Sequence, residues 1–371
     1  MATANERLQA AGISHGVDLQ HYANGVVLRI IKLLNSTDTD LLAQITAAME
    51  RMPASGFSAE RLDALLISVR RLNKDAYLTI ERELTPELLK LVEYEAVYQL
   101  ELFKSAVPSI VQTQLAIGAV NVEQVYTASL SRPFQGRLLK EWMAGLEEGR
   151  ALRVRDAIRM GYMENQTISQ IVQRLRGTRA KGYSDGIIEI DRKNAEMVTR
   201  TAISHMAGTT RNRFYEANRD LTKGLKWSAF LDTRTTEICI LRDGKLYDND
   251  HKPLGHSLPW LGGPGLAHWG CRSSSVPVLK SMKELGIDLP ESDIARTRAS
   301  MDGQVPADTS YGAWLKAQSA ERQNEVLGKT RAKLLRDGGL TVDRFANNKG
   351  QWLTLDELRT RDAAAFTKAG L

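Results

Sequence analysis

Both cysteines of this 371-residue chain and three of its six histidines fall within residues 227–279. Thiolate sulfur and imidazole nitrogen are the ligands that zinc prefers, and structural zinc is usually four-coordinate. Cys239, His268 and Cys271 would supply three ligands, and the last two are close enough for one turn to present both. The fourth ligand would come from His256, His251 or Asp232. One interpretation is therefore a loop-rich segment stabilised by a bound zinc ion.

A second interpretation, which we prefer, is that these residues hold the shape of a small module. Asp232 with Thr235 and Thr236 would cap a short helix that runs through Cys239. Asp232 and Arg272 could pair and hold the turns together. Both cysteines would then be small buried groups rather than ligands.

The same interpretation predicts the strands and the turn of this module. Asp243 and Gly244 form a sequence typical of a tight turn. Strands are expected over residues 227–231 and 274–279, where apolar residues flank the turn-rich middle of the segment. The result would be a small β-containing cap on a helical body.

A third interpretation is catalysis, in which a carboxylate acts with His268 as in a hydrolase or a nuclease. The candidate carboxylates are Asp232, Asp243, Asp248 and Asp250. A Cys239–His268 dyad is a further arrangement of this kind. The chain has no HExxH motif, no Gly-rich phosphate loop and no G-x-S-x-G motif. We therefore expect a protein that is not an enzyme.

The rest of the chain reads as one helix after another. Helical periodicity begins near residues 26–33, and the polar run 35–38 predicts a break before a second helix over residues 40–52. Thr85 and Pro86 predict the start of another helix. Residues 187–190 are a short strand candidate ahead of a long helix over 191–218.

Three helices have clear local start signals. Asn121 is a plausible N-cap for residues 122–131, and Thr167 begins a capping box with Gln170. Thr354 begins a second capping box near the C-terminus. These signals depend only on residues that are close in sequence, so they do not require knowledge of the rest of the fold.

The net charge of +6 is concentrated in the middle of the chain. Residues 137–226 hold 18 Lys and Arg against 11 Asp and Glu, a difference of +7. Basic residues gather at the end of the helix predicted from Ile168, where cations complement the helix dipole: Arg174, Arg176, Arg179 and Lys181. They are our candidates for binding nucleic acid or a partner. No run of about 18 apolar residues is present, so we expect a soluble protein with no membrane partner.

Several uncommon residues occur in one order across the cysteine region. They are Asp232-x-Arg234-Thr235-Thr236-x-x-Cys239, then Arg242-Asp243-Gly244-Lys245-x-Tyr247, then His268-x-x-Cys271-Arg272-Ser273. This order resembles the phage Mu F-type minor head proteins, also called the phage head morphogenesis family, and the resemblance extends over most of residues 140–279. Many relatives carry an additional cysteine near the first, whereas Ile238, Ile240 and Leu241 surround Cys239 here.

The resemblance implies a minor structural protein of a tailed-phage head, acting in head morphogenesis and in DNA packaging or ejection. Its partners would be the portal protein or the major capsid protein, with packaged DNA as a further partner and no small-molecule substrate. Its place would be the virion, in the head interior or at the portal vertex, after assembly in the bacterial host cytoplasm. The shared motif residues given a structural role are Asp232, Arg234, Thr235, Asp243, Gly244 and Arg272. The alternatives are a zinc-stabilised DNA-binding protein and an ejected effector with latent enzymatic activity.

The expected fold is mainly α with a small α+β module. Residues 1–136 would form an elongated helical region that docks on the portal or capsid. Residues 137–279 would form the Mu F-like head morphogenesis domain, a helical and β domain that contains the Cys/His region. Residues 280–371 would form a helical C-terminal extension. No cofactor is certain, and zinc is the one that the residues could hold.

Overall fold

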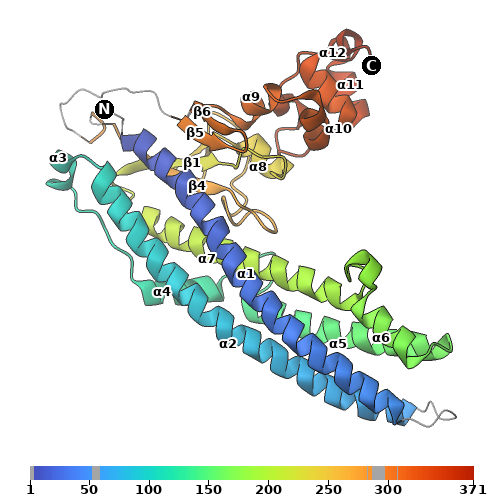
Figure 1. Cartoon of the computed structure of the whole chain (residues 1–371). Helices are drawn as coiled ribbons and strands as arrows, with labels where there is room; N and C mark the ends of the chain where they lie inside the picture. The colour runs from blue at the N-terminus through green and yellow to red at the C-terminus, as the bar shows by residue number, and fades with distance from the viewer. Residues whose placement is uncertain (1–3, 52–58, 282, 286–296, 307) are drawn as a thin grey trace. The chain divides into compact units, whose positions relative to one another are not determined.

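The computed structural model describes residues 4–51, 59–281, 283–285, 297–306 and 308–371, and Figure 1 shows the chain as a ribbon. The fold is mainly helical with a small antiparallel sheet, as the sequence predicted. The first half is made of helices α1 (Ala4–Glu50), α2 (Ala59–Ala106), α3 (Ser109–Gln112), α4 (Val122–Ser131), α5 (Leu139–Met163), α6 (Ile168–Arg176), η1 (Arg179–Lys181) and α7 (Ile187–Ala217).

The second half holds the strands and the shorter helices. They are β1 (Thr222–Ser228), α8 (Glu237–Arg242), β2 (Leu246–Tyr247), β3 (Pro253–Leu254), β4 (Ser274–Leu279), β5 (Thr297–Ser300), β6 (Gly303–Pro306), α9 (Tyr311–Lys316), α10 (Ala320–Arg336), η2 (Val342–Phe345), α11 (Leu355–Arg361) and α12 (Ala363–Ala369). The β5–β6 hairpin was not predicted.

The chain divides into two compact units, each assembled from separate stretches of sequence. The first unit contains Met1–Gln20, Val92–Tyr126 and Ser204–Leu371, and therefore the whole sheet and the Cys/His region. The second unit contains His21–Leu91 and Thr127–Ile203, and the elements described in it are helices.

Helix α1 runs without interruption through the polar residues at which a break was predicted, so that prediction is wrong. The hydroxyls of Thr37 and Thr39 donate hydrogen bonds to backbone carbonyls one turn earlier, so both polar side chains are satisfied within the helix. Asp38 is buried and pairs with Arg150 and Arg192 of the same unit. Partners that lie more than 100 residues away make a buried aspartate tolerable in mid-helix.

Two further local predictions failed for a similar reason. Pro86 lies inside α2 and does not begin a helix; Leu84 and Leu88 on either side of it are both buried, so tertiary packing outweighs the proline cost of about 3 kcal/mol. Residues 187–190 are the first turn of α7 rather than a strand. Ile188 faces the apolar core of the second unit, with Ile171 and Leu175 of α6.

The start signals that depend on neighbouring residues were confirmed. The Asn121 side chain accepts a hydrogen bond from the Gln124 amide at 2.9 Å. Thr167 and Gln170 form a reciprocal capping box at the start of α6. Thr354 forms the second predicted box with Glu357 at the start of α11.

The main sheet has the strand order β3-β2-β1-β4, and all its pairs are antiparallel. Strand β4 was predicted with its observed bounds, whereas β1 begins and ends earlier than the predicted strand over 227–231. Helix α8 interrupts the chain between β1 and β2, which brings Cys239 to the sheet. Helices α10, α11 and α12 form a group within the same unit (Figure 1).

The first unit contains two apolar cores. One is rich in aromatic rings and includes Phe103, Phe214, Trp227 and both cysteines. The other joins α8 to the C-terminal helices through Leu241, Tyr311, Trp314, Phe345 and Phe366. Helix α8 therefore contributes to both cores, with Cys239 in the first and Ile240 and Leu241 in the second.

Candidate functional site

The fold brings Cys239, His268 and Cys271 together in the first unit. Cys239 lies in α8, and the other two residues lie in the loop before β4. The two sulfurs are 3.7 Å apart, and His268 Nε2 lies 3.2 Å from Cys239 Sγ. All three ligand atoms lie within 4.8 Å of one another. Both cysteines are buried and His268 is half-buried, so the group is accessible only from its imidazole side.

Hydrogen bonds fix the tautomer of His268. Its Nδ1 lies 2.9 Å from the carbonyl oxygen of Trp269, which can only accept, so Nδ1 carries the proton. In the neutral ring Nε2 then presents a lone pair toward Cys239 and toward the Thr236 hydroxyl, which lies at 2.9 Å. A carbonyl that orients a histidine in this way is the usual outer partner of a metal-binding imidazole.

Cys271 is the more acidic of the two thiols. The hydrogen bond from Cys239, together with the backbone amides of Gly265, Ser273 and Ala267, lowers the pKa of Cys271 to about 7 against the opposing effect of burial. The hydrogen bond to Cys271 and burial raise the pKa of Cys239. Cys271 is therefore the first of the two thiols to lose its proton as pH rises.

Gly265 is required at its position in this arrangement. Its φ is +82°, in the region that side chains rarely adopt, and its amide donates to Cys271 Sγ at 3.2 Å. The N–H dipole of Gly265 thus points toward the buried Cys271 sulfur.

The two sulfurs are spaced as in a tetrahedral zinc site. A tetrahedral site with zinc–sulfur bonds of about 2.3 Å places two sulfurs about 3.8 Å apart, close to the 3.7 Å observed here. This separation is far from the ~2.05 Å of a disulfide bond. Among the described residues, no fourth His, Cys, Asp or Glu joins the group.

The residues proposed as a fourth ligand have other partners in this structure. His256 Nε2 lies 2.8 Å from the Leu246 carbonyl, and its Nδ1 accepts from the Leu258 amide. His251 stacks on Trp260 with ring centroids 4.7 Å apart. Asp232 is held by Arg272, so the fourth position of a metal site is not supplied from these three side chains as they lie.

Asp232 and Arg272 form the predicted pair. Two nitrogens of Arg272 donate to the two carboxylate oxygens at 2.5 and 2.8 Å. The Arg234 amide and the Thr235 hydroxyl donate to the same carboxylate, as in a capped turn. Burial acts to raise the pKa of Asp232, but the hydrogen bonds and charge of Arg272 outweigh it and lower that pKa. Thr236 is the N-cap of α8 through its backbone, without a side-chain capping bond.

Asp243 connects the sheet to the C-terminal helices. One carboxylate oxygen accepts from the Ala229 amide and the other from the Tyr311 amide, each at 2.8 Å and in a buried setting. The Tyr311 hydroxyl donates to the Asp232 carbonyl at 2.7 Å. Gly244 follows with φ +76°, as a tight turn requires. These motif residues therefore hold elements together within one unit.

Two groups of charged residues were missed by the sequence analysis. Arg242 is fully buried beneath Trp227 and donates to the carbonyls of Pro259 and Ile238. Glu95 of α2 is fully buried and accepts from His15 at 2.6 Å and from Arg211 at 3.0 Å. A glutamate inside an otherwise apolar helical stripe was the available signal for this second group.

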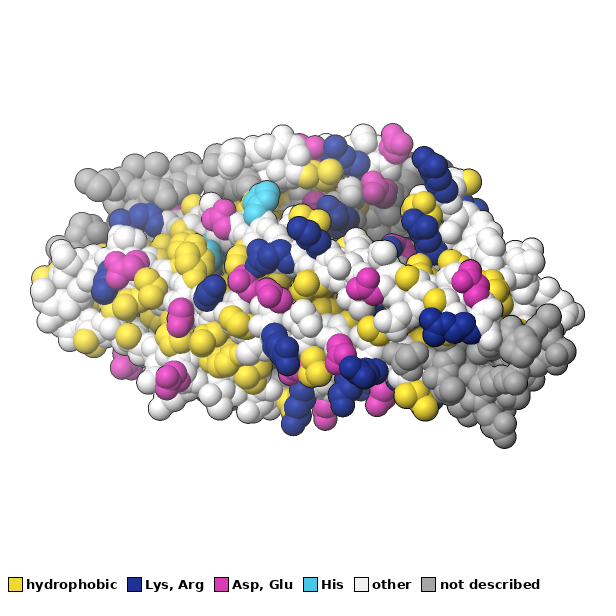
Figure 2. All heavy atoms as spheres, turned by 60° about the horizontal axis from the view of Figure 1, so that its bottom comes forward, with side chains coloured by type: hydrophobic (Ala, Val, Ile, Leu, Met, Phe, Trp, Pro, Cys, Tyr) yellow, Lys and Arg dark blue, Asp and Glu magenta, His cyan; other side chains and the backbone are white. Residues whose placement is uncertain are grey.

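The four basic residues near α6 do not act as one free patch. Arg174 pairs with Glu164, the Arg176 guanidinium lies over the Tyr183 ring at 4.8 Å, and Lys181 lies 3.9 Å from Asp185. Arg179 is exposed. On the face drawn in Figure 2, Lys and Arg side chains alternate with Asp and Glu side chains. That mixture weakens the field that one sign of charge would produce.

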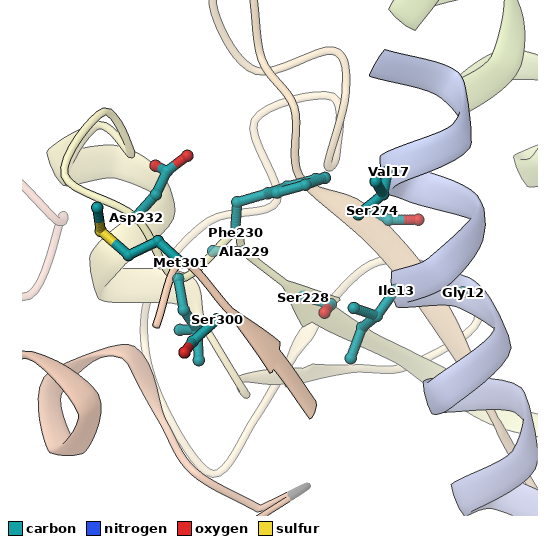
Figure 3. A pocket seen from close by; sticks show the side chains of 11 residues that line it. Gly12, Ile13, Val17, Ser228, Ala229, Phe230, Asp232, Ser274, Ser300 and Met301 are labelled. Carbon is teal, nitrogen blue, oxygen red and sulfur yellow. The ribbon is translucent and has the colours of Figure 1, made fainter. Parts of the chain in front are cut away.

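A separate cavity of about 160 Å³ lies between α1 and the sheet in the first unit. Gly12, Ile13 and Val17 of α1 form one wall, and Phe230 and Met301 lie across from them (Figure 3). The lining is mostly apolar, and its carboxylate, Asp232, is already neutralised by Arg272. The cavity therefore suits an apolar side chain better than a charged ligand.

These features define a mainly helical protein whose motif residues are engaged in internal contacts around a Cys/His group. Residues 151–276 match a family model described as phage Mu protein F like protein, which covers about a third of the chain. This segment of the chain is therefore similar to the phage Mu F-like family, as its sequence motifs predicted. No curated protein and no solved structure matches the chain. Within the described residues, every helix is too short or too polar to cross a membrane.

Proposed function

We propose that this protein is a minor structural component of a tailed-phage head that works by binding the portal protein or the major capsid protein. The observation that supports binding over catalysis is the engagement of the motif side chains. Asp232, Asp243 and Arg272 are held by internal partners, and Asp232, which lines the apolar cavity, is paired with Arg272. Their role in this account is to fix the shape that other head proteins recognise.

The surface proposed for docking is the N-terminal helical region, residues 1–136. Leu28 on α1 and Ile67 on α2 are about two-thirds exposed, at 70% and 65%. Burial of apolar side chains is the main favourable contribution to most protein association, so these two side chains are the ones with which the proposal is tested. The partner would therefore present an apolar surface.

Co-expression with the portal protein of the same phage tests this proposal. The wild-type chain should co-purify with the portal, and the Leu28→Ser/Ile67→Ser double variant should lose most of that association. Met163→Ser, which changes a 77% exposed residue of α5 outside this region, is the matched control and should keep it. Equal retention of all three proteins would contradict docking through this region. Absence of the wild-type chain from portal fractions would contradict portal binding itself.

Contact with packaged DNA is the second part of the proposal, carried by the exposed Arg179 and Lys181 beside α6. Counterion release predicts that affinity for duplex DNA falls steeply as salt rises. Arg179→Ala/Lys181→Ala should reduce both affinity and salt dependence, whereas the exposed control Lys349→Ala should not. No binding of the wild type at low salt would remove DNA from the proposal.

Zinc binding at Cys239, His268 and Cys271 is the third part, supported by the donor types, their separations and the tautomer of His268. A bound ion would stabilise the loop before β4. Protein purified under reducing conditions should contain zinc near one atom per chain, and Cys271→Ser should lose it. Near-zero zinc in the wild type after reconstitution would contradict this part. It would favour buried thiols with a purely packing role.

A further inference from the structure

The Cys/His group is open on one side only, and that side is the imidazole edge. Both sulfurs are buried, at 2% and 0% exposure for Cys239 and Cys271. His268 is half-buried, and its Nε2 meets the exposed Thr236 hydroxyl at 2.9 Å. Any molecule that reaches the group from solvent would therefore pass Thr236.

The start of α8 explains why Thr236 occupies that place. The Thr236 carbonyl accepts hydrogen bonds from the amides of Cys239 and Ile240, and these bonds begin the helix. Its hydroxyl makes no capping bond and points instead to His268. One helical turn thus presents the Thr236 hydroxyl and the Cys239 sulfur to the same imidazole nitrogen.

We propose that the metal site has three ligands among the described residues, Cys239, His268 and Cys271, and a fourth position that opens beside Thr236 to an imidazole from another molecule. This inference rests on the zinc binding proposed above. Two thiolates balance the charge of a divalent ion, so a neutral imidazole adds no net charge to a largely buried centre. An added anion would leave an uncompensated charge there. The natural donor would be a histidine of a neighbouring head protein.

Cobalt provides the readout, because Co²⁺ takes the place of zinc in such sites and its visible spectrum reports the ligand set. Full-length protein is reduced, loaded with Co²⁺ and titrated with free imidazole. The expected result is a saturable shift of the cobalt bands in the wild type. Thr236→Leu should bind the same amount of cobalt and lose the shift, because the larger apolar side chain blocks the approach. Glu237→Leu changes the next exposed residue and should retain the shift.

Each other outcome has a defined meaning. Cobalt that binds but does not respond to imidazole overturns the open position. If His256→Ala or His251→Ala also changes that spectrum, the chain closes the site with its own histidine. If neither cobalt nor zinc binds to the reduced wild type, the metal proposal fails and the open position fails with it. A shift that persists in Thr236→Leu shows that ligands enter by another route and contradicts the role given to Thr236.

Discussion

Asp243 should be the most sensitive single position in the module, because one carboxylate satisfies two buried amides. The Ala229 and Tyr311 amides each donate to it at 2.8 Å. An asparagine offers one oxygen, so one amide would lose its acceptor and face an NH₂ group. A buried donor left without a partner costs about 1–3 kcal/mol. Asp243→Asn should therefore destabilise the first unit by about 1–3 kcal/mol, and Asp243→Ala by about twice that.

The measurement is denaturant unfolding followed by tryptophan fluorescence, combined with hydrogen exchange of peptides that contain residues 229 and 311. Exchange is needed because a chain with two compact units need not unfold in a single transition. Both amides should exchange faster in Asp243→Ala than in the wild type. Asp220→Asn removes an exposed carboxylate near β1 and should change stability by less than about 0.5 kcal/mol. The reasoning is refuted if Asp243→Asn matches that control and both amides keep wild-type protection.

Three further predictions follow from individual contacts. Tyr311→Phe removes the 2.7 Å hydrogen bond to the Asp232 carbonyl and should cost about 0.5–1.5 kcal/mol in denaturant unfolding; no measurable change would contradict the bond. The pKa of Glu95 is lowered from its ordinary 4.5 to about 2: burial opposes this, but the charge of Arg211 and the hydrogen bond from His15 outweigh it. The ionised Glu95 carboxylate therefore stabilises the fold fully above pH 4.5, and this stabilisation is lost as pH falls toward about 2. Glu95→Gln should flatten the acid side of a curve of Tm against pH. An unchanged curve would count against a link between the Glu95 pKa and stability. Gly265→Ala forces a side chain to a φ of +82° and should cost about 1–3 kcal/mol as well as lower zinc content, whereas full stability with full zinc content would contradict the role of its amide.

Local signals in the sequence predicted local structure well. The capping boxes that begin at Thr167 and Thr354 formed as expected, since each needs residues only three positions apart. The mainly helical class with a small sheet was also predictable, because helical periodicity fills the chain outside the turn-rich segment. The Asp232–Arg272 pair followed from their shared place in the motif.

The failures share a different physical cause, which is compensation by residues far away in sequence. Asp38 was expected to help end a helix, because the local sequence does not show that Arg150, 112 residues later, would pair with it. Pro86 looked like a helix start because the burial of its neighbours could not be read from the chain. Glu95 gave no sign that Arg211, 116 residues away, would meet it.

The residue types of the candidate site could be predicted from the sequence, but the number of residues that meet at the two sulfurs could not. Cys239 and Cys271 lie 32 positions apart, and only the insertion of α8 beside the sheet explains how they meet. Nothing in the sequence indicates that His256 would turn to the Leu246 carbonyl. Hydrogen bonds made by loop backbone therefore decide which of several histidines approaches the sulfurs.

The measurement that tests the central claim most directly is the amount of this chain in purified heads. A phage lacking the gene would be complemented with wild-type protein, and its heads would be separated from free protein and examined by quantitative mass spectrometry. The account predicts a small, fixed number of copies per particle. Expressed, folded wild-type chain that is absent from purified infectious heads would contradict it.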